Sequence, residues 1–282
     1  MTSCSAGGRG LARVALVAVL TLAVSAAAAA QFNRLSQFNR LSRSRLASPA
    51  DFDGMFHFCR LVYDSARSAD RGGSWQTDWP NADINMSIRL SELTRTRVSF
   101  TGGSPNPLLV QPSDDLLFQC PMVIMTAPGS AFFGEDDAAR LREFLMKGGF
   151  LWADDSWGSY QWEQWESQIT KVLPPPQFEI VDLPLDHPLL RTQFVVTEIP
   201  QIPNIGYFRR SGGDTSERGA DSAVPVARMI ADAGGRILVL MTHNTDISDS
   251  WEREGEDASY FYAFSPRGYA LGINVFLYAL TH

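Results

Sequence analysis

Motifs that hold nucleotides are missing from this sequence. No Walker A motif and no G-x-G-x-x-G pattern stands where a strand would pass into a helix, and glycine pairs such as Gly212-Gly213 are typical of turns. These motifs cradle phosphate groups with backbone amides, so the sequence gives no support for a nucleotide cofactor such as NAD or ATP. A G-x-S-x-G elbow is also absent, which leaves a serine hydrolase poorly supported.

Basic residues are scarce beyond the N-terminus. The whole chain has 24 Lys and Arg against 31 Asp and Glu. The first 50 residues contain six Arg and no acid, so residues 51–282 carry 18 basic against 31 acidic residues, a formal charge of −13. Nucleic acid selects basic surfaces, so no nucleic-acid partner is expected.

Cysteine is rare as well, with three in the chain. Cys4 precedes the N-terminal apolar run and is not placed to be a lipidated first residue. Cys59 and Cys120 both lie in apolar stretches. Two cysteines in an exported protein could pair, but free cysteine often behaves as a small core residue. The sequence therefore favours two buried thiols, with a disulfide as the alternative.

Long apolar runs are confined to the N-terminus. Residues 1–30 combine Arg9 and Arg13, an apolar run and a final alanine tract, which is typical of a secretory signal peptide cut before Gln31. An uncleaved membrane anchor is the alternative, since the apolar part nearly spans a bilayer. We expect export to the periplasm or cell envelope, with membrane association at most through this N-terminal segment.

Residues 31–50 are predicted to be a basic, flexible linker. They contain the hexapeptide QFNRLS twice, together with four Arg and no acid. Attachment to anionic lipid or to an envelope polymer is the alternative. Residues 51–282 are numerous enough to form a single domain with a full core.

That domain alternates strand-like and helix-like segments. Short apolar or β-branched runs predict strands at 55–63, 121–127, 150–153 and 178–184, and a hairpin over 224–242. Apolar residues at helical spacing predict helices at 81–93, 135–147 and 160–173, and a C-terminal helix with Ser265 as cap and Pro266 in its first position. This alternation predicts an α/β fold with a mostly parallel sheet.

Polar side chains follow the predicted strands. Ligands bind outside the carboxyl ends of strands in open α/β sheets, so we expect these side chains to meet at one rim. They are Asp64, Thr126, Asp154, Asp155, and the run from His243 through Asn244 to Asp246.

The stretch GGFLWADDSWG ends an apolar strand on two adjacent acids. Asp154 and Asp155 could act as an acid and an ionised partner, bind Mg²⁺ or Ca²⁺ through oxygen, or cap the following helix. Neighbouring side chains on a strand point to opposite faces, so one of the two is expected at the rim. We choose Asp155 because it lies later in the turn, beside Trp157.

His243 follows the most apolar predicted strand. It could serve as a base or a metal ligand, with Asp246 to orient it or to share a metal. The spacing matches no tight metal signature such as H-E-x-x-H, and a structural role is the alternative. Several tryptophans flank the same loops, and tryptophan beside aspartate suits a sugar. Trp162 and Trp165 are expected to be core residues instead.

Several stretches resemble, in order, a bacterial family catalogued as domain of unknown function 4159. They are FCRLVYDS, WQTDWPNAD with RLSELT, GGFLWADD, DHPLL, HNTDISDSWE and ALGINVFLYALTH, and they span nearly all of 56–282. The resemblance implies a divergent class I glutamine-amidotransferase-like fold, a flavodoxin-like three-layer sandwich, and brings no established activity. Amidotransferases of this fold place a nucleophilic Cys on a sharp strand-to-helix turn. Here the comparable turn holds Asp154 and Asp155, so glutaminase chemistry is not expected.

Three functional hypotheses follow. The first is an exported module that binds a small polar ligand, such as a glycan, or an envelope protein, through Asp64, Asp154, Asp155, Trp157, Asn244 and Asp246. The second is a hydrolase that uses Asp155, His243 and Asp246, with or without a divalent metal. It requires Asp155 and His243 within hydrogen-bond or single-water reach. The third, a scaffold subunit, predicts a broad apolar patch and no convergent acids.

Overall fold

A computed structural model describes residues 45–66 and 73–282. The predicted signal peptide and most of the predicted linker lie outside the described residues. Leu46–His282 form one compact unit. Its first residues, Leu46 and Ala47, bond to Leu109 at the edge of the sheet, so the unit includes the end of the segment predicted as a linker.

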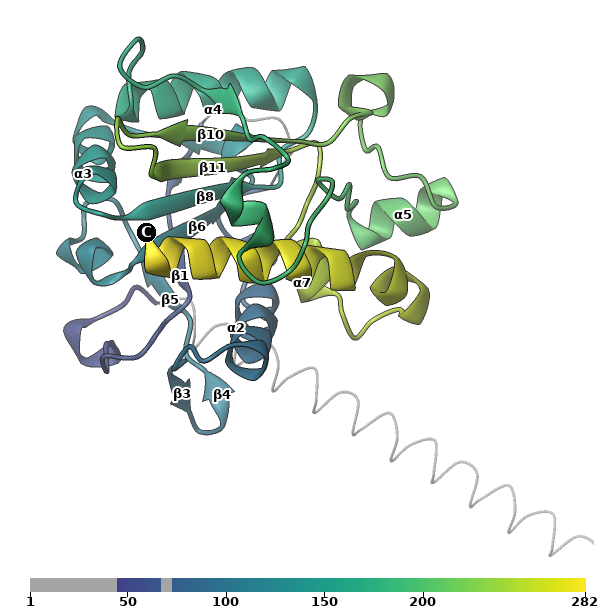
Figure 1. Cartoon of the computed structure of the whole chain (residues 1–282), viewed down its shortest axis with the longest axis horizontal. Helices are drawn as coiled ribbons and strands as arrows, with labels where there is room; N and C mark the ends of the chain where they lie inside the picture. Colours follow the sequence, from purple (N-terminus) through teal and green to yellow (C-terminus); the bar gives the residue numbers. More distant parts are fainter. Residues whose placement is uncertain (1–44, 67–72) are drawn as a thin grey trace, which may run out of the picture. The chain divides into compact units, whose positions relative to one another are not determined.

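The centre of the unit is a seven-stranded sheet with the order β5-β1-β6-β8-β11-β10-β9 (Figure 1). Five neighbouring strands, β5, β1, β6, β8 and β11, run parallel, and β10 pairs antiparallel with both of its neighbours, β11 and β9. The strands are β1 Cys59–Leu61, β5 Leu108–Val110, β6 Met122–Thr126, β8 Phe150–Asp154, β9 Val181–Asp182, β10 Val226–Ala231 and β11 Ile237–His243. The predicted α/β class and mostly parallel sheet are confirmed, as is the β10–β11 hairpin.

The central strands are apolar throughout because helices cover both faces of the sheet. Their side chains alternate between two core clusters. Trp152 and Leu240 point to one cluster, and Leu151 and Val239 to the other. Period-two alternation with both faces apolar is the pattern of a buried parallel sheet.

Two pairs of helices form the outer layers (Figure 1). α2 (Asn81–Leu93) and α7 (Ala258–Thr281) pack on the first face, and α3 (Glu135–Met146) and α4 (Gly158–Val172) on the second. The result is a three-layer α/β sandwich. Two short helices, α5 (Ile205–Ser211) and α6 (Asp249–Glu252), lie in the connections around α7.

The prediction for the C-terminal helix is wrong at its start. α7 begins at Ala258, and Pro266 lies inside it. Asp257 is the cap, because its carboxylate accepts hydrogen bonds from the backbone amides of Ser259 and Tyr260. Ser265, the predicted cap, instead donates its hydroxyl to the carbonyl of Ser250 at 2.7 Å, which ties α7 to α6.

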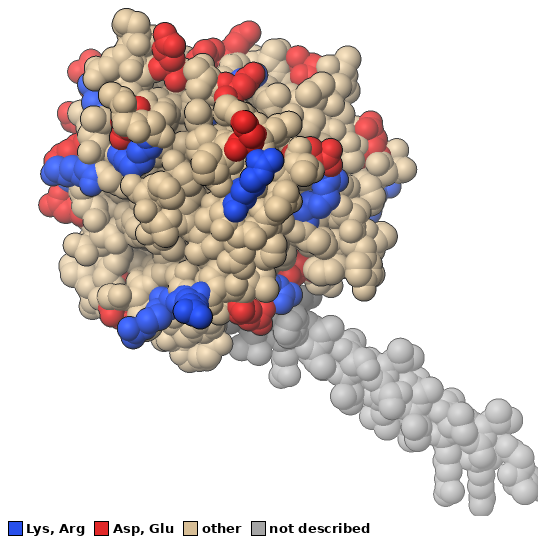
Figure 2. All heavy atoms as spheres, in the orientation of Figure 1, with Lys and Arg blue, Asp and Glu red and all other residues tan. Residues whose placement is uncertain are grey.

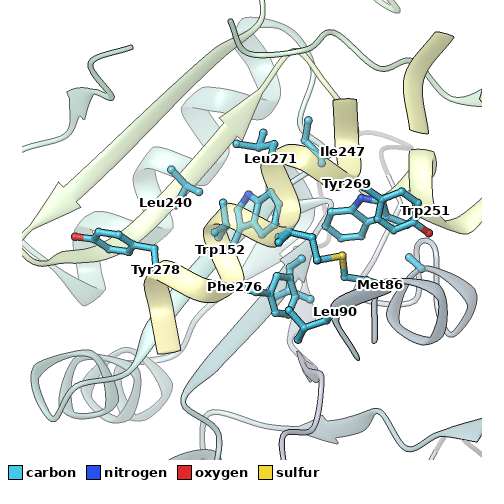
Figure 3. Packing of buried hydrophobic residues seen from close by; sticks show 14 of the residues in the cluster. Met86, Leu90, Trp152, Leu240, Ile247, Trp251, Tyr269, Leu271, Phe276 and Tyr278 are labelled. Atoms are coloured by element: carbon cyan, nitrogen blue, oxygen red, sulfur yellow. The ribbon is translucent and has the colours of Figure 1, made fainter. Parts of the chain in front are cut away.

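Aromatic side chains hold α6 and α7 against the sheet (Figure 3). Trp152 of β8 meets Trp251 of α6 edge to face, with ring centroids 5.6 Å apart. Phe276 of α7 contacts both rings. Gly272 allows this packing, since a Cβ there would lie 2.5 Å from the Trp251 ring.

The preference for two free thiols is wrong. Cys59 and Cys120 form a disulfide, with Cα atoms 6.2 Å apart and 61 positions between them in sequence. Cys59 begins β1, and Cys120 lies just before the neighbouring strand β6. The pairing of the two strands brings the cysteines together, and sequence spacing carries no sign of this.

Two small sheets complete the described part of the chain: β2 (Asp64–Ser65) with β7 (Ala131–Phe132), and β3 (Phe100–Thr101) with β4 (Ser104–Pro105). Among the described helices, none combines the length and the apolar character needed to span a membrane.

Candidate functional site

The parallel strands β6, β8 and β11 end at one edge of the sheet. Each is followed at once by a residue in the left-handed region: Ala127 (φ 50°), Asp155 (φ 64°) and Asn244 (φ 61°). This conformation costs an L-residue roughly 1 kcal/mol or more, and such strain gathers at functional sites. The backbone therefore turns sharply at three adjacent strand ends, where α/β folds bind ligands.

Four aspartates from three segments converge at this edge, and we call them the acidic centre: Asp78, Asp155, Asp246 and Asp249. Carboxylate oxygens of Asp78, Asp246 and Asp249 lie within 4.8 Å of one another. Their side chains are buried: Asp249 is 0% exposed, Asp246 3%, and Asp78 and Asp155 8% each. Asp78 and Asp155 are thus the least buried of the four, and all four remain buried.

Asp78 comes from the turn before α2. Fully buried Arg60 holds this turn, because its guanidinium donates to the carbonyls of Trp75 (3.2 Å) and Thr77 (2.8 Å). The charge of Arg60 is itself paired with buried Asp83. The Oδ2 atom of Asp78 has no hydrogen-bond partner among the described residues.

Asp246 and Asp249 stand on the connection from β11 into α6. The backbone amide of Asp249 donates to Asp246 Oδ1 at 2.9 Å. Asp249 Oδ2 accepts from the amide of Ile205 (2.8 Å) and the hydroxyl of Tyr260 (3.0 Å). Both carboxylates are thus fixed before any ligand binds.

Asp154 shapes the connection that carries these two acids. Its carboxylate accepts four hydrogen bonds, from the Thr242 hydroxyl (2.6 Å), the Ile247 amide (3.3 Å), and the Ser248 amide (2.9 Å) and hydroxyl (2.8 Å). The side chain is fully buried. Asp154 is therefore a positioning residue that holds 247–248 against the end of β8.

Asp155 points into the acidic centre. The indole of Trp157 donates to Asp155 Oδ1 at 3.0 Å. Burial raises the pKa of Asp155 well above 3.8, and the charges of Asp154, Glu217 and Asp249 raise it further. Asp154 and Asp155 thus have different surroundings, and the binding role at the rim expected for Asp155 stays a prediction.

The other members of the centre share this electrostatic environment. Burial, followed by the charge of Asp249, raises the pKa of Asp78 well above 3.8. Burial, followed by the charges of Asp78 and Asp155, does the same to the pKa of Asp246. Two carboxylates 4.8 Å apart repel by about 3.5 kcal/mol at an effective dielectric constant of about 20. Protons or a bound cation must offset this repulsion.

The excess of acidic residues in the sequence does not form one acidic patch on the surface seen in Figure 2. Acidic and basic side chains are scattered over the face seen in Figure 2, and uncharged atoms separate most of them. The acidic centre is buried instead, and its nearest cation besides Arg60 is Arg253, which lies 3.4 Å from Asp249 Oδ1 and 2.7 Å from Glu252.

His243 belongs to a separate set of contacts. Its Nε2 lies 3.0 Å from the carbonyl of Gly158, and its Nδ1 lies 3.3 Å from the guanidinium of Arg228. A neutral ring protonated at Nε2 satisfies both contacts. Burial lowers the pKa of His243 below 6.5. Its ring packs on Trp162, with centroids 5.1 Å apart. No hydrogen bond among the described residues joins His243 to Asp155 or Asp246.

The remaining predicted residues have structural contacts. Asn244 accepts from the amide of Gly158 (2.9 Å) and donates to the carbonyl of Val224 (2.9 Å), which joins the β11 end to its neighbours. Thr126 accepts from Arg60 at 2.7 Å. Asp64 is exposed on β2, and its charge acts on Asp137 of α3 rather than on the acidic centre. Trp157 supports Asp155, as described above.

The strand-to-helix turn between β8 and α4 places Asp155, not a thiol, at its sharpest point. The cysteines of the described chain, Cys59 and Cys120, are bonded to each other. Neither of these cysteines therefore carries a free thiol at this turn.

Sequence reasoning missed Asp78 and Asp249. Asp78 stands in a polar loop that shows no periodicity, and only the fold brings it to the strand ends. Asp249 follows Asp246 by three positions, the spacing at which side chains share one side of a helical turn. That D-x-x-D spacing after a buried strand is the signal that could have identified it.

A mostly parallel sheet with helices on both faces and carboxylates at its strand ends defines an α/β protein. Its candidate site lies at the edge where folds of this class bind ligands. Residues 57–280 match the family described as Domain of unknown function (DUF4159), and the chain belongs to that family. A comparison with curated proteins finds no match.

Proposed function

We propose that this chain is an exported cell-envelope protein whose domain binds a small polar ligand at the acidic centre and does not catalyse a reaction. The observation that carries the proposal is the convergence of Asp78, Asp155, Asp246 and Asp249 at the strand ends. A scaffold role would require no such convergence. The centre is preorganised by Asp154 and Arg60, and Asp78 and Asp155 are its least buried members at 8% exposed each.

Export is supported by two independent features. Residues 1–30 have the composition of a signal peptide. The Cys59–Cys120 disulfide suits an oxidising compartment such as the periplasm or the cell exterior. Expression in a bacterial host followed by cell fractionation and N-terminal sequencing tests this. A mature form that begins at Gln31 is expected, and an uncut chain in the membrane fraction would favour an anchor.

A binding role is favoured over hydrolysis by the contacts of His243. The hydrolase hypothesis needs this ring beside Asp155, yet Gly158 and Arg228 engage both of its nitrogens. We also propose that the domain is a divergent member of the class I glutamine-amidotransferase-like, flavodoxin-like fold. Asp155 then occupies the turn where those enzymes carry their nucleophile.

The ligand proposal is tested with a panel of neutral sugars, amino sugars and cell-wall disaccharides, each measured by calorimetric titration. We expect binding by the wild type and at least a tenfold loss in Asp155→Asn. Asp115→Asn is the matched control, because its side chain is 95% exposed and precedes β6, away from the strand ends. Equal binding by both variants would place the ligand elsewhere.

A further inference from the structure

We propose that the acidic centre binds a hard divalent cation, Ca²⁺ in preference to Mg²⁺, with Asp78, Asp246 and Asp249 as direct ligands. The inference deepens the proposed binding function and rests on the same site. In this proposal the cation binds to the acidic centre before, or together with, any organic ligand.

The first argument is distance. One oxygen from each of Asp78, Asp246 and Asp249 lies within 4.8 Å of the other two. Ca²⁺ binds oxygen at about 2.3–2.6 Å, so two ligand oxygens of one ion are separated by at most about 5 Å. The three carboxylates can therefore reach one ion as they stand.

The second argument is the state of Asp78. Its Oδ2 atom is buried and has no hydrogen-bond partner in the described chain, although the residue as a whole is 8% exposed. Buried polar atoms are almost always satisfied, so this atom indicates a missing partner. The adjacent cation Arg60 does not fill that role, because Asp83 and two carbonyls engage it.

The third argument is the anchoring of the ligands. Asp249 Oδ2 is held by Ile205 and Tyr260, and Asp246 Oδ1 by the amide of Asp249. Metal-bound carboxylates commonly have such outer hydrogen bonds, which fix their orientation. Arg253 approaches Asp249 Oδ1 only at 3.4 Å, which leaves that oxygen weakly engaged.

The donor set selects the kind of ion. All the converging atoms are carboxylate oxygens, which suit Ca²⁺, Mg²⁺ and Mn²⁺, whereas Zn²⁺ prefers nitrogen and sulfur. The nearest histidine along this edge, His243, is engaged by Gly158 and Arg228. Mg²⁺ demands near-octahedral geometry at about 2.0–2.1 Å and retains its water, so the wider arrangement favours Ca²⁺.

Terbium luminescence is the direct test. Tb³⁺ replaces Ca²⁺ at oxygen sites. The indoles of Trp79, next to Asp78, and Trp251, two positions after Asp249, can sensitise its emission. The purified protein, stripped with EDTA, is titrated with Tb³⁺, and the signal is then competed with Ca²⁺, Mg²⁺ and Zn²⁺. We expect saturable emission that Ca²⁺ removes at a concentration at least tenfold below that of Mg²⁺.

Asp78→Asn is the main variant, and Asp115→Asn its control. Asp78→Asn should weaken Tb³⁺ and Ca²⁺ binding at least tenfold, and Asp115→Asn should bind as the wild type does. Circular dichroism checks that Asp78→Asn is folded. If it is not, Asp155→Asn is used, and it should weaken binding at least threefold. Absence of saturable emission in the wild type, or equal binding by the site variant and the control, overturns the proposal.

The sugar titrations are repeated with and without Ca²⁺ to separate the two proposals. Cation binding without any sugar binding leaves the metal site standing and removes the organic ligand. Sugar binding by a protein that binds no cation overturns the metal site and leaves the binding function standing.

Discussion

Asp154 and Asp155 are neighbours in sequence, yet their carboxyl groups have opposite surroundings. Asp154 accepts four hydrogen bonds, one from Thr242 of β11 and three from residues 247–248, whereas the Asp155 carboxylate accepts one, from Trp157, and otherwise faces acids. Because the backbone turns sharply at Asp155, which has a left-handed conformation, the side chains of Asp154 and Asp155 point in different directions. One residue therefore stabilises the fold, and the other places negative charge in the site.

The same substitution should have opposite effects at these two positions. Asp154→Asn loses charge-assisted acceptors and sets an amide against buried donors, which should lower the free energy of unfolding by about 2–4 kcal/mol. Asp155→Asn keeps a residue that tolerates the left-handed turn and removes repulsion, so it should raise stability by about 1–2 kcal/mol. Urea unfolding at neutral pH in EDTA measures both. A loss of stability in Asp155→Asn would assign that acid a capping role.

The disulfide should contribute measurably to stability. Replacing both Cys59 and Cys120 by Ala should lower the free energy of unfolding by about 2–5 kcal/mol, because the bond closes a long loop in the unfolded chain. Dithiothreitol should destabilise the wild type and leave the double variant unchanged. Alkylation under denaturing, non-reducing conditions gives an independent check. Alkylation of both Cys59 and Cys120 in the wild type would contradict the disulfide and support the two free thiols that the sequence favours.

His243 should make stability depend on pH. Burial lowers the folded-state pKa below the unfolded value of 6.5, so protons bind preferentially to the unfolded chain. The contribution of the neutral ring is present above pH 6.5 and is lost as the pH falls through the folded-state pKa. Unfolding of the wild type and His243→Gln, compared from pH 7.5 down to pH 5, should show the wild type losing more stability.

His243→Gln also tests whether the contacts of His243 are independent of the acidic centre. His243→Gln should bind Ca²⁺ with an affinity within about twofold of the wild type, because the imidazole contacts Gly158, Arg228 and Trp162 rather than the acidic centre. A large loss of Ca²⁺ affinity would bring His243 back into the site and revive the hydrolase hypothesis.

The parts of the fold that sequence could predict are those with strong local patterns. The continuous apolar runs of β6, β8 and β11 and the periodic helices α2 and α3 have their boundaries within about two residues of the expected ones. The start of α7 was missed because Ser265-Pro266 imitates a helix start. The true cap, Asp257, precedes aromatic residues that carry little propensity signal.

The acidic centre could be predicted only in part. Asp155 and Asp246 follow strands directly, so the rule for strand ends finds them. Asp78 and the Cys59–Cys120 bond depend on which distant segments become neighbours in the sheet, and one sequence does not carry that information. His243 is the last residue of β11, but its side chain contacts Arg228 on β10, a direction set by the antiparallel hairpin.

Gly272 of α7 gives a final prediction that links the core to the site. In an exposed helix, Gly→Ala gains about 1 kcal/mol. Here the new methyl would lie 2.5 Å from the Trp251 ring and 3.2 Å from Met86, and overpacking of this kind costs about 1–3 kcal/mol. Because the collision outweighs the helix propensity, Gly272→Ala should be destabilised by about 1–2 kcal/mol. Gly255→Ala is the control, since no atom lies within 4 Å of its added Cβ.

The steric clash in Gly272→Ala should also disturb the acidic centre. Trp251 and Asp249 belong to the same short helix, α6, so a displaced indole moves the carboxylate that Ile205 and Tyr260 hold. Gly272→Ala should therefore bind Tb³⁺ several-fold more weakly than Gly255→Ala, although neither position touches the ion. Unchanged Tb³⁺ affinity in a destabilised Gly272→Ala would mean that α6 holds Asp249 in place independently of its packing on α7.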